Sequence, residues 1–96
     1  MSKGADLAAR IEAAGHDPDA VMKFSDPGFD RAAVGMTHDG RLVYDYALMV
    51  RQLAEDDGIS EEEAAEFVDY NSLRSLPYMG PGAPMVFCRF EEDADE

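Results

Sequence analysis

A segment rich in proline and glycine near the end of the chain most constrains the fold. Residues 71–84 read NSLRSLPYMGPGAP, with three prolines, two glycines and a single charged residue, Arg74. Proline fixes φ and lacks a backbone donor, so regular structure is not expected to continue through the segment. We therefore predict a connector that turns the chain back after a helix. The large apolar side chains from Leu73 to Met79, including Tyr78, would pack over the edge of the core.

The residues on either side of the connector have the patterns of strands. Residues 32–37 and 41–44 predict a β-hairpin around the turn His38-Asp39-Gly40, where Gly40 can adopt a positive φ. Gly35, inside the first strand, predicts a close approach by another backbone. Residues 85–90, MVFCRF, predict a third strand. Its apolar character predicts burial on both faces or a central place in the sheet, with Cys88 packed in the interior.

Three further segments have helical spacing. Residues 3–14 place Leu7, Ile11 and Ala14 on one stripe, and Gly15 is a suitable stop. A second helix begins after Asp45 as N-cap and ends at Gly58. A third begins at Ser60, with a capping box to Glu63, and runs to about Asn71.

These elements together predict a small α+β domain. A β-hairpin plus a C-terminal strand would form a three-stranded antiparallel or mixed sheet, with helices packed on one face and an N-terminal helix. The 96 residues suit one domain, which we place at 1–90, followed by an acidic flexible tail at 91–96.

The placement of charge is uneven. The net charge is −13, and residues 55–69 together with the tail hold 13 acids and no base. The rest of the chain is balanced, with eight acids and eight Lys or Arg residues. Such a surface opposes direct binding to nucleic acid or anionic membranes, and it favours a basic protein partner. With no signal peptide and no long apolar run, we expect a cytoplasmic protein.

The residue types required for catalysis do not form a recognisable pattern. A calcium loop built around Gly58 or Gly40 lacks the required carboxylates, and a zinc site would need a Cys/His cluster. His16 and His38 lie in turn sequences and have no identifiable nucleophile beside them. We therefore predict a protein that is not an enzyme and has no cofactor, metal site or catalytic residue.

Part of the chain resembles a known family. GRLVYDY, DDGISEEEA and YNSLRSLPYMGPGAP are similar to motifs of a family of small bacterial proteins of unknown activity, over residues 33–87. Ile59 and the N-terminal 30 residues depart from the family pattern. The resemblance implies one domain and assigns no activity or catalytic residue.

The candidate binding residues combine the acidic segment with neighbouring aromatic and arginine side chains of the types enriched at interfaces. They are Glu55, Asp56, Asp57, Glu62, Glu63, Glu66, Asp69, Tyr70, Arg74 and Tyr78. The leading hypothesis is a module that binds a basic partner. A specific form of it is an inhibitor that mimics nucleic acid, of the phage or mobile-element (anti-CRISPR) type.

Two alternatives stay open. The acids could serve only to solvate a well-capped helix. Or the chain could be an adaptor or homodimer that uses the apolar surface of residues 70–81. Asn71 and Arg74 have a structural interpretation as well, in which they bond free helix carbonyls or Arg74 pairs with Asp69.

Overall fold

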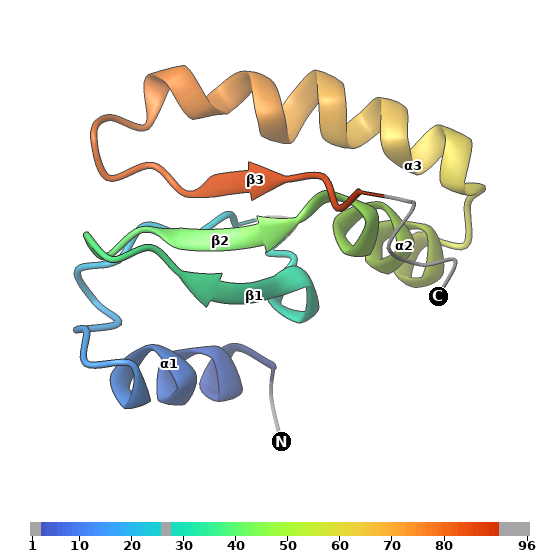
Figure 1. Ribbon diagram of the computed structural model, residues 1–96. Coiled ribbons are helices and arrows are strands. Elements are labelled where there is room, and N and C mark those ends of the chain that lie inside the picture. Colours follow the sequence, from blue (N-terminus) through green and yellow to red (C-terminus); the bar gives the residue numbers. More distant parts are fainter. Residues whose placement is uncertain (1–2, 26–27, 91–96) are drawn as a thin grey trace.

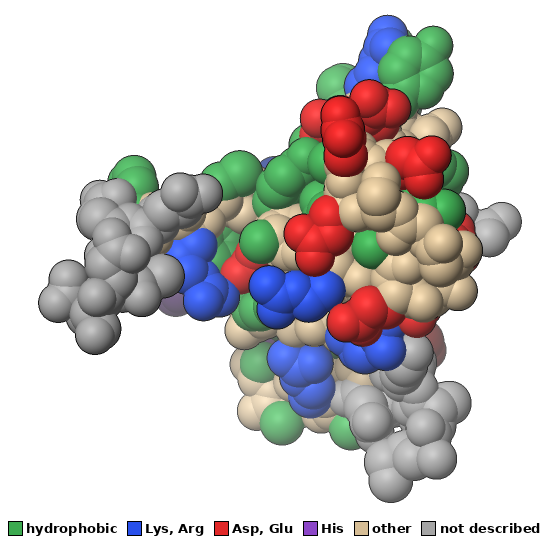
Figure 2. All heavy atoms as spheres, turned by 90° about the vertical axis from the view of Figure 1, so that its right-hand side faces the viewer, with side chains coloured by type: hydrophobic (Ala, Val, Ile, Leu, Met, Phe, Trp, Pro, Cys, Tyr) green, Lys and Arg blue, Asp and Glu red, His purple; other side chains and the backbone are tan. Residues whose placement is uncertain are grey.

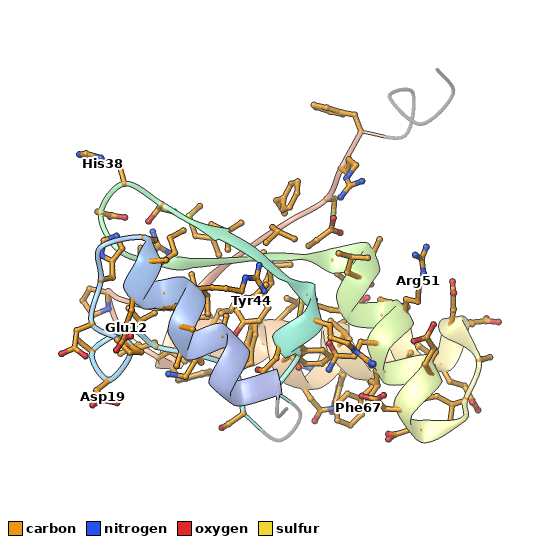
Figure 3. All side chains as sticks on the ribbon, turned by 90° about the horizontal axis from the view of Figure 1, so that it is seen from below. Glu12, Asp19, His38, Tyr44, Arg51 and Phe67 are labelled. Atoms are coloured by element: carbon orange, nitrogen blue, oxygen red, sulfur yellow. The ribbon has the colours of Figure 1, made fainter. Side chains whose placement is uncertain are left out.

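The predicted α+β fold is confirmed. The computed structural model describes residues 3–25 and 28–90, and its three strands form one mixed sheet in the order β1-β2-β3. Strand β1 (Ala33–Met36) runs antiparallel to β2 (Leu42–Asp45), and β3 (Met85–Phe87) runs parallel to β2 (Figure 1). Figure 3 shows the helices gathered on one side of this sheet.

Three α-helices and three shorter helical segments make up the rest of the regular structure in the described chain. The α-helices are α1 (Lys3–Ala13), α2 (Tyr46–Asp57) and α3 (Glu61–Phe67). A π-helical segment, Val68–Leu73, continues α3 directly. The two 3₁₀ turns are Asp30–Ala32 and Leu76–Tyr78. The predicted tail, 91–96, lies outside the described residues.

An aromatic cluster at the centre of the core joins the central strand to the segment before β1. Tyr44 of β2 is fully buried on the helix side of the sheet (Figure 3), and its ring lies 4.9 Å from that of Phe24. Phe29 packs edge-on against Phe24 at 6.0 Å. Phe29 has φ 56°, a left-handed conformation that costs a non-glycine residue about 1 kcal/mol or more, which its complete burial offsets.

The N-terminal helix covers the sheet beside β1. Leu7 and Ile11 are buried as predicted, whereas Ala14 lies beyond the end of α1 and is exposed. Gly15 ends the helix with φ 91°. The guanidinium of Arg10 donates to the carbonyl of Ala33 at 2.8 Å, so a long polar side chain ties the helix to the strand.

A buried carboxylate lies where β2 passes into α2. Asp45 is 1% exposed, and its Oδ1 accepts hydrogen bonds from the amides of Ala47 and Leu48, which makes it the N-cap that was predicted. Its Oδ2 accepts from Arg89 Nη2 at 2.7 Å. Because Arg89 follows β3, this ion pair fixes the end of the parallel strand against the start of α2.

The predictions made for the third strand are wrong in two respects. β3 covers only Met85–Phe87 and is an edge strand, with Met85 and Phe87 both exposed, while β2 holds the central place. Cys88 is exposed and not packed in the interior. The parallel register explains the exposure of Met85 and Phe87: Val86 pairs with buried Tyr44 on the core side, so its neighbours face the side without helices. Cys88 lies beyond the end of β3, where the pairing with β2 has stopped.

The connector is shorter than predicted because its first half is helical. Helical structure continues through Arg74 and Ser75 to Tyr78, so only residues 79–84 form the turn back to β3. Leu73, Leu76 and Met79 pack against the core as expected. Tyr78 does not, since it is 89% exposed. Pro77 occupies the first turn of the 3₁₀ segment, a position where proline's missing N–H costs little.

Two turn predictions have different outcomes. Gly40 adopts φ 90°, as the hairpin requires. The imidazole of His16 lies against Gly40, which leaves His16 partly buried. His38, in the same turn as Gly40, is exposed. Gly35 is not approached by another backbone, since a Cβ there would meet nothing within 4 Å. It lies instead at an irregularity in the β1–β2 register, where a glycine is often found.

The Asp45 carboxylate makes a measurable contribution to stability. We expect Asp45→Ala to lower the free energy of unfolding by about 2 kcal/mol, because it removes a helix cap and leaves Arg89 without its partner. Asp45→Asn keeps a capping oxygen and should lose less. Urea unfolding checks both, with Asp57→Ala as a control expected to stay within about 0.5 kcal/mol. Equal losses for Asp45→Ala and Asp57→Ala would contradict this role.

Burial of Tyr44 predicts a loss of stability at high pH. Desolvation raises the pKa of Tyr44 to about 12 from the model-compound value of 10.0. Between these values the unfolded chain has released the phenol proton while the folded chain retains it. The free energy of unfolding should therefore fall by up to ~1.4 kcal/mol per pH unit as the pH rises.

The matched variant is Tyr44→Phe, compared with wild type by urea unfolding across this pH range. It should be less stable at neutral pH by about 1–3 kcal/mol, because the Phe24 amide donates to the Tyr44 hydroxyl at 3.2 Å and would lose its acceptor. Its stability should then fall less steeply above pH 10, the model-compound pKa. If the free energy of unfolding of Tyr44→Phe falls with pH as steeply as that of wild type, Tyr44 is not the group that causes the loss of stability at high pH.

Candidate functional site

A group of carboxylates covers the outer side of α3 and the end of α2. We call it the acidic face and define it as Glu55, Asp56, Asp57, Glu61, Glu62, Glu63, Glu66 and Asp69. All eight are exposed. Figure 2 shows acidic side chains gathered in the upper part of one side of the molecule, with hydrophobic side chains among them and basic ones below them and at the top edge.

Two local signals position this face. Gly58 ends α2 in the left-handed conformation, with φ 67°, and Ser60 then caps α3 by accepting from the amide of Glu63 at 3.0 Å. The first turn of α3 carries Glu61, Glu62 and Glu63, where the partial positive charge of a helix N-terminus reduces the repulsion between them. The other side of the helix buries Ala64 and Val68, so the carboxylates point to water.

Few of these carboxylates are neutralised within the chain. Asp56 forms an ion pair with Arg31 at 2.8 Å, and both side chains are well exposed. Asp69 accepts a hydrogen bond from the hydroxyl of Tyr46 at 2.9 Å. In residues 3–25 and 28–90 no other carboxylate of the acidic face forms an ion pair with Lys or Arg. The face therefore keeps most of its negative charge available to a partner.

The helix changes its winding next to these acids. In the π-helical turn at Val68–Leu73, backbone hydrogen bonds join residues five apart instead of four. Such turns are rare in proteins overall, and those that occur are often at functional sites. The side-chain amide of Asn71 donates to the carbonyl of Phe67 at 3.2 Å. This is the carbonyl-bonding role predicted for Asn71, although the helix does not end there.

A shallow depression of about 620 Å³ lies over this change of winding. Five of the predicted residues line it, together with Phe67 and Asn71: they are Glu63, Glu66, Asp69, Tyr70 and Arg74. Phe67 is 39% exposed and Tyr70 is 69% exposed. The depression thus combines carboxylates with two accessible aromatic rings, one of which, Phe67, is not among the candidate binding residues of the sequence analysis.

Arg74 lies beside Tyr70, one of its neighbours among the candidate binding residues, and not beside the Asp69 partner of its structural interpretation. Its guanidinium carbon lies 4.8 Å from the centroid of the Tyr70 ring, a cation–π contact, and it forms no ion pair with Asp69. Asp69 and Arg74 are five positions apart, which is not one of the i, i+3 or i, i+4 spacings that bring side chains together on a helix, whereas Tyr70 and Arg74 are four apart.

The remaining predicted residues lie apart from the depression. Glu55, Asp56 and Asp57 end α2, and Glu62 lies on α3 outside the lining. Tyr78 is exposed at the end of the 3₁₀ turn and is not part of the lining either. The structure therefore places five candidate residues in the depression and four acids outside it, which we call the acidic margin, with Tyr78 apart from both groups.

Further depressions were not predicted, and two of them are close to the first in volume. One, of about 670 Å³, lies between the start of α2 and the residues after β3, and it includes Arg51, which points outward in Figure 3, and Arg89. The other is mostly apolar and lies under residues 80–86, where Arg41 Nε donates to the carbonyl of Ala83 at 2.8 Å. Both are formed by residues far apart in sequence, so no local pattern indicates them.

Residues 3–25 and 28–90 contain no group of three or more His, Cys, Asp or Glu side chains placed to share a metal ion. Cys88 is exposed, and no hydrogen bond of the described chain joins it to a base.

Comparisons with protein families, curated proteins and solved structures give no match to this chain. The resemblance noted for residues 33–87 stays a prediction. Among the described residues, no helix has the length and apolar character needed to cross a membrane.

The Tyr46–Asp69 bond gives a test of the site geometry. Desolvation, together with the Asp69 carboxylate, raises the pKa of Tyr46 to about 12. In Asp69→Asn, which removes the charge next to the phenol, we expect this pKa to move down toward 10.0, measured by NMR titration of the tyrosine ring. Glu66→Gln should leave it in place. An unchanged pKa in Asp69→Asn would show that α2 and the π-helical turn do not meet as described.

Proposed function

We propose that this chain is a non-enzymatic interaction module that binds a basic protein partner through the acidic face, with the depression beside it as the centre of contact. The observation that carries the proposal is the exposure of all eight carboxylates of the acidic face, of which only Asp56 is paired with a base in the described chain. Like charges held together cost a few tenths of a kcal/mol per pair, a cost that a basic partner would remove.

A more specific form of the proposal is mimicry of nucleic acid. Residues 61–69 carry five carboxylates and span about 12 Å at 1.5 Å per residue. One strand of DNA carries a charge about every 3.4 Å, so the two linear charge densities are similar. The partner in this form is a nucleic-acid-binding protein whose basic groove the acidic face occupies, and the chain acts as its inhibitor. No direct contact with nucleic acid is involved.

An apolar adaptor or homodimer surface on residues 70–81 receives less support. Leu73, Leu76 and Met79 are only partly accessible, because each packs against the core. The exposed apolar side chains of this segment are Tyr70, Pro77, Tyr78 and Pro81, and Tyr70 already contacts Arg74. Two tyrosines and two prolines form a smaller apolar surface than an obligate interface needs.

Affinity capture from cell lysate, compared across salt concentrations and charge variants, tests the proposal. A variant with Glu55, Glu62, Glu63 and Glu66 changed to Gln should lose the captured partner, because four charges leave the acidic face. The matched control changes Glu12 to Gln and Asp17, Asp19 and Asp39 to Asn. It removes the same charge from exposed positions away from α3, two of which Figure 3 labels at the opposite end of the molecule.

We expect the control variant to retain the partner, and wild type to release it in 1 M NaCl, where the screening length is about 3 Å. Equal loss in both variants would mean that only net charge matters. Capture that persists in 1 M NaCl would contradict a charge-driven interface.

A further inference from the structure

The aromatic rings in the depression give it a preference for arginine over lysine that is stronger than carboxylates alone would provide. The rings of Phe67 and Tyr70 are both accessible and line the same concavity as Glu63 and Glu66. An aromatic face attracts a cation within about 6 Å, and a planar guanidinium stacks on it more readily than an ammonium. Carboxylates nearby can bond the edges of the same guanidinium, since a carboxylate accepts two parallel N–H bonds from arginine but not from lysine.

The chain itself supplies an example of this chemistry. Arg74 lines the depression and lies 4.8 Å from the centroid of the Tyr70 ring. Within residues 3–25 and 28–90 it forms no ion pair, although Glu66 and Asp69 line the same concavity. A guanidinium of the chain is therefore already held by an aromatic ring at a site where acids are close but do not bond it.

We propose that the depression formed by Glu63, Glu66, Phe67 and Tyr70 takes an arginine side chain of the partner, and that Arg74 covers part of this site in the free chain. The inference rests on the proposed function and specifies the partner: it presents arginine at the centre of its contact surface. The acidic margin around the depression attracts any basic segment, and the aromatic rings select arginine over lysine.

The ratio of two peptide affinities tests the selection. Hexaarginine and hexalysine, both with blocked ends, carry equal charge. The ratio of the Kd of hexalysine to the Kd of hexaarginine therefore does not depend on the attraction between net charges, which is the same for both peptides. We expect wild type to bind hexaarginine roughly two- to five-fold more tightly, the effect of one exposed cation–π contact. Isothermal titration at low salt measures both values with the full chain.

Two variants locate the selection in the depression. Tyr70→Leu should lower the ratio toward one, because it keeps an apolar side chain and removes one of the two aromatic faces. Arg74→Met should raise the ratio, because it removes the cation that covers the ring. Tyr78→Leu is the control, since Tyr78 is also an exposed tyrosine but lies outside the lining, and its ratio should equal that of wild type.

Circular dichroism of each variant confirms that it is folded before its ratio is used. A ratio of one in wild type would overturn the inference, as would an unchanged ratio in Tyr70→Leu or a ratio in Arg74→Met that is unchanged or lower. These results are separable from the failure of the proposed function. If Glu66→Gln weakens both peptides more than Glu12→Gln does, the acidic face binds basic segments even without selection. If the two variants are equal, the proposed function fails as well.

Discussion

The arrangement of the sheet and α2 depends on the hydrogen bonds and the ion pair of the Asp45 carboxylate. This carboxylate lies at the junction of the central strand and α2, where it caps the helix and accepts from Arg89. The parallel pairing of β2 with β3 joins segments that are far apart in sequence, since Asp45 and Arg89 are separated by 44 positions. A three-residue edge strand cannot hold these segments together by itself. One buried side chain thus sets both the start of a helix and the end of the sheet.

The position of the acidic face follows from this junction. Since α2 begins at a fixed point and ends at Gly58, the short turn to Ser60 places α3 against α2, with its carboxylates outward. The helical run then continues through a π-helical turn before the chain returns to β3. The turn brings two aromatic rings and Arg74 beside the acids. The segment of the chain that leads from α2 back to β3, and so completes the sheet, therefore also forms the proposed site.

The features that the sequence predicted well are those with local causes. The caps at Asp45 and Ser60 and the stop at Gly58 each depend on a few adjacent residues, and all three are confirmed. The core contact of Phe24 with Tyr44 joins residues 20 apart, and no pattern in the segment around Phe24 indicates it. The helical continuation through residues 74–78 was missed for a different reason: Pro77 and the glycines after it resemble a connector, although proline is tolerated in a first helical turn. The acids of the candidate site were found because charge is visible in the sequence, whereas the depression depends on the turn.

The most direct test of the central claim, that the acidic face and its depression form the binding surface, is NMR mapping. A ¹⁵N-labelled sample of the full chain would be titrated with hexaarginine, and the amide shifts followed along the described residues. The account predicts that the largest shifts fall within residues 61–74, with small shifts in the strands. Largest shifts at Val34, Val43 or Phe87, on the side of the sheet without helices, would contradict it.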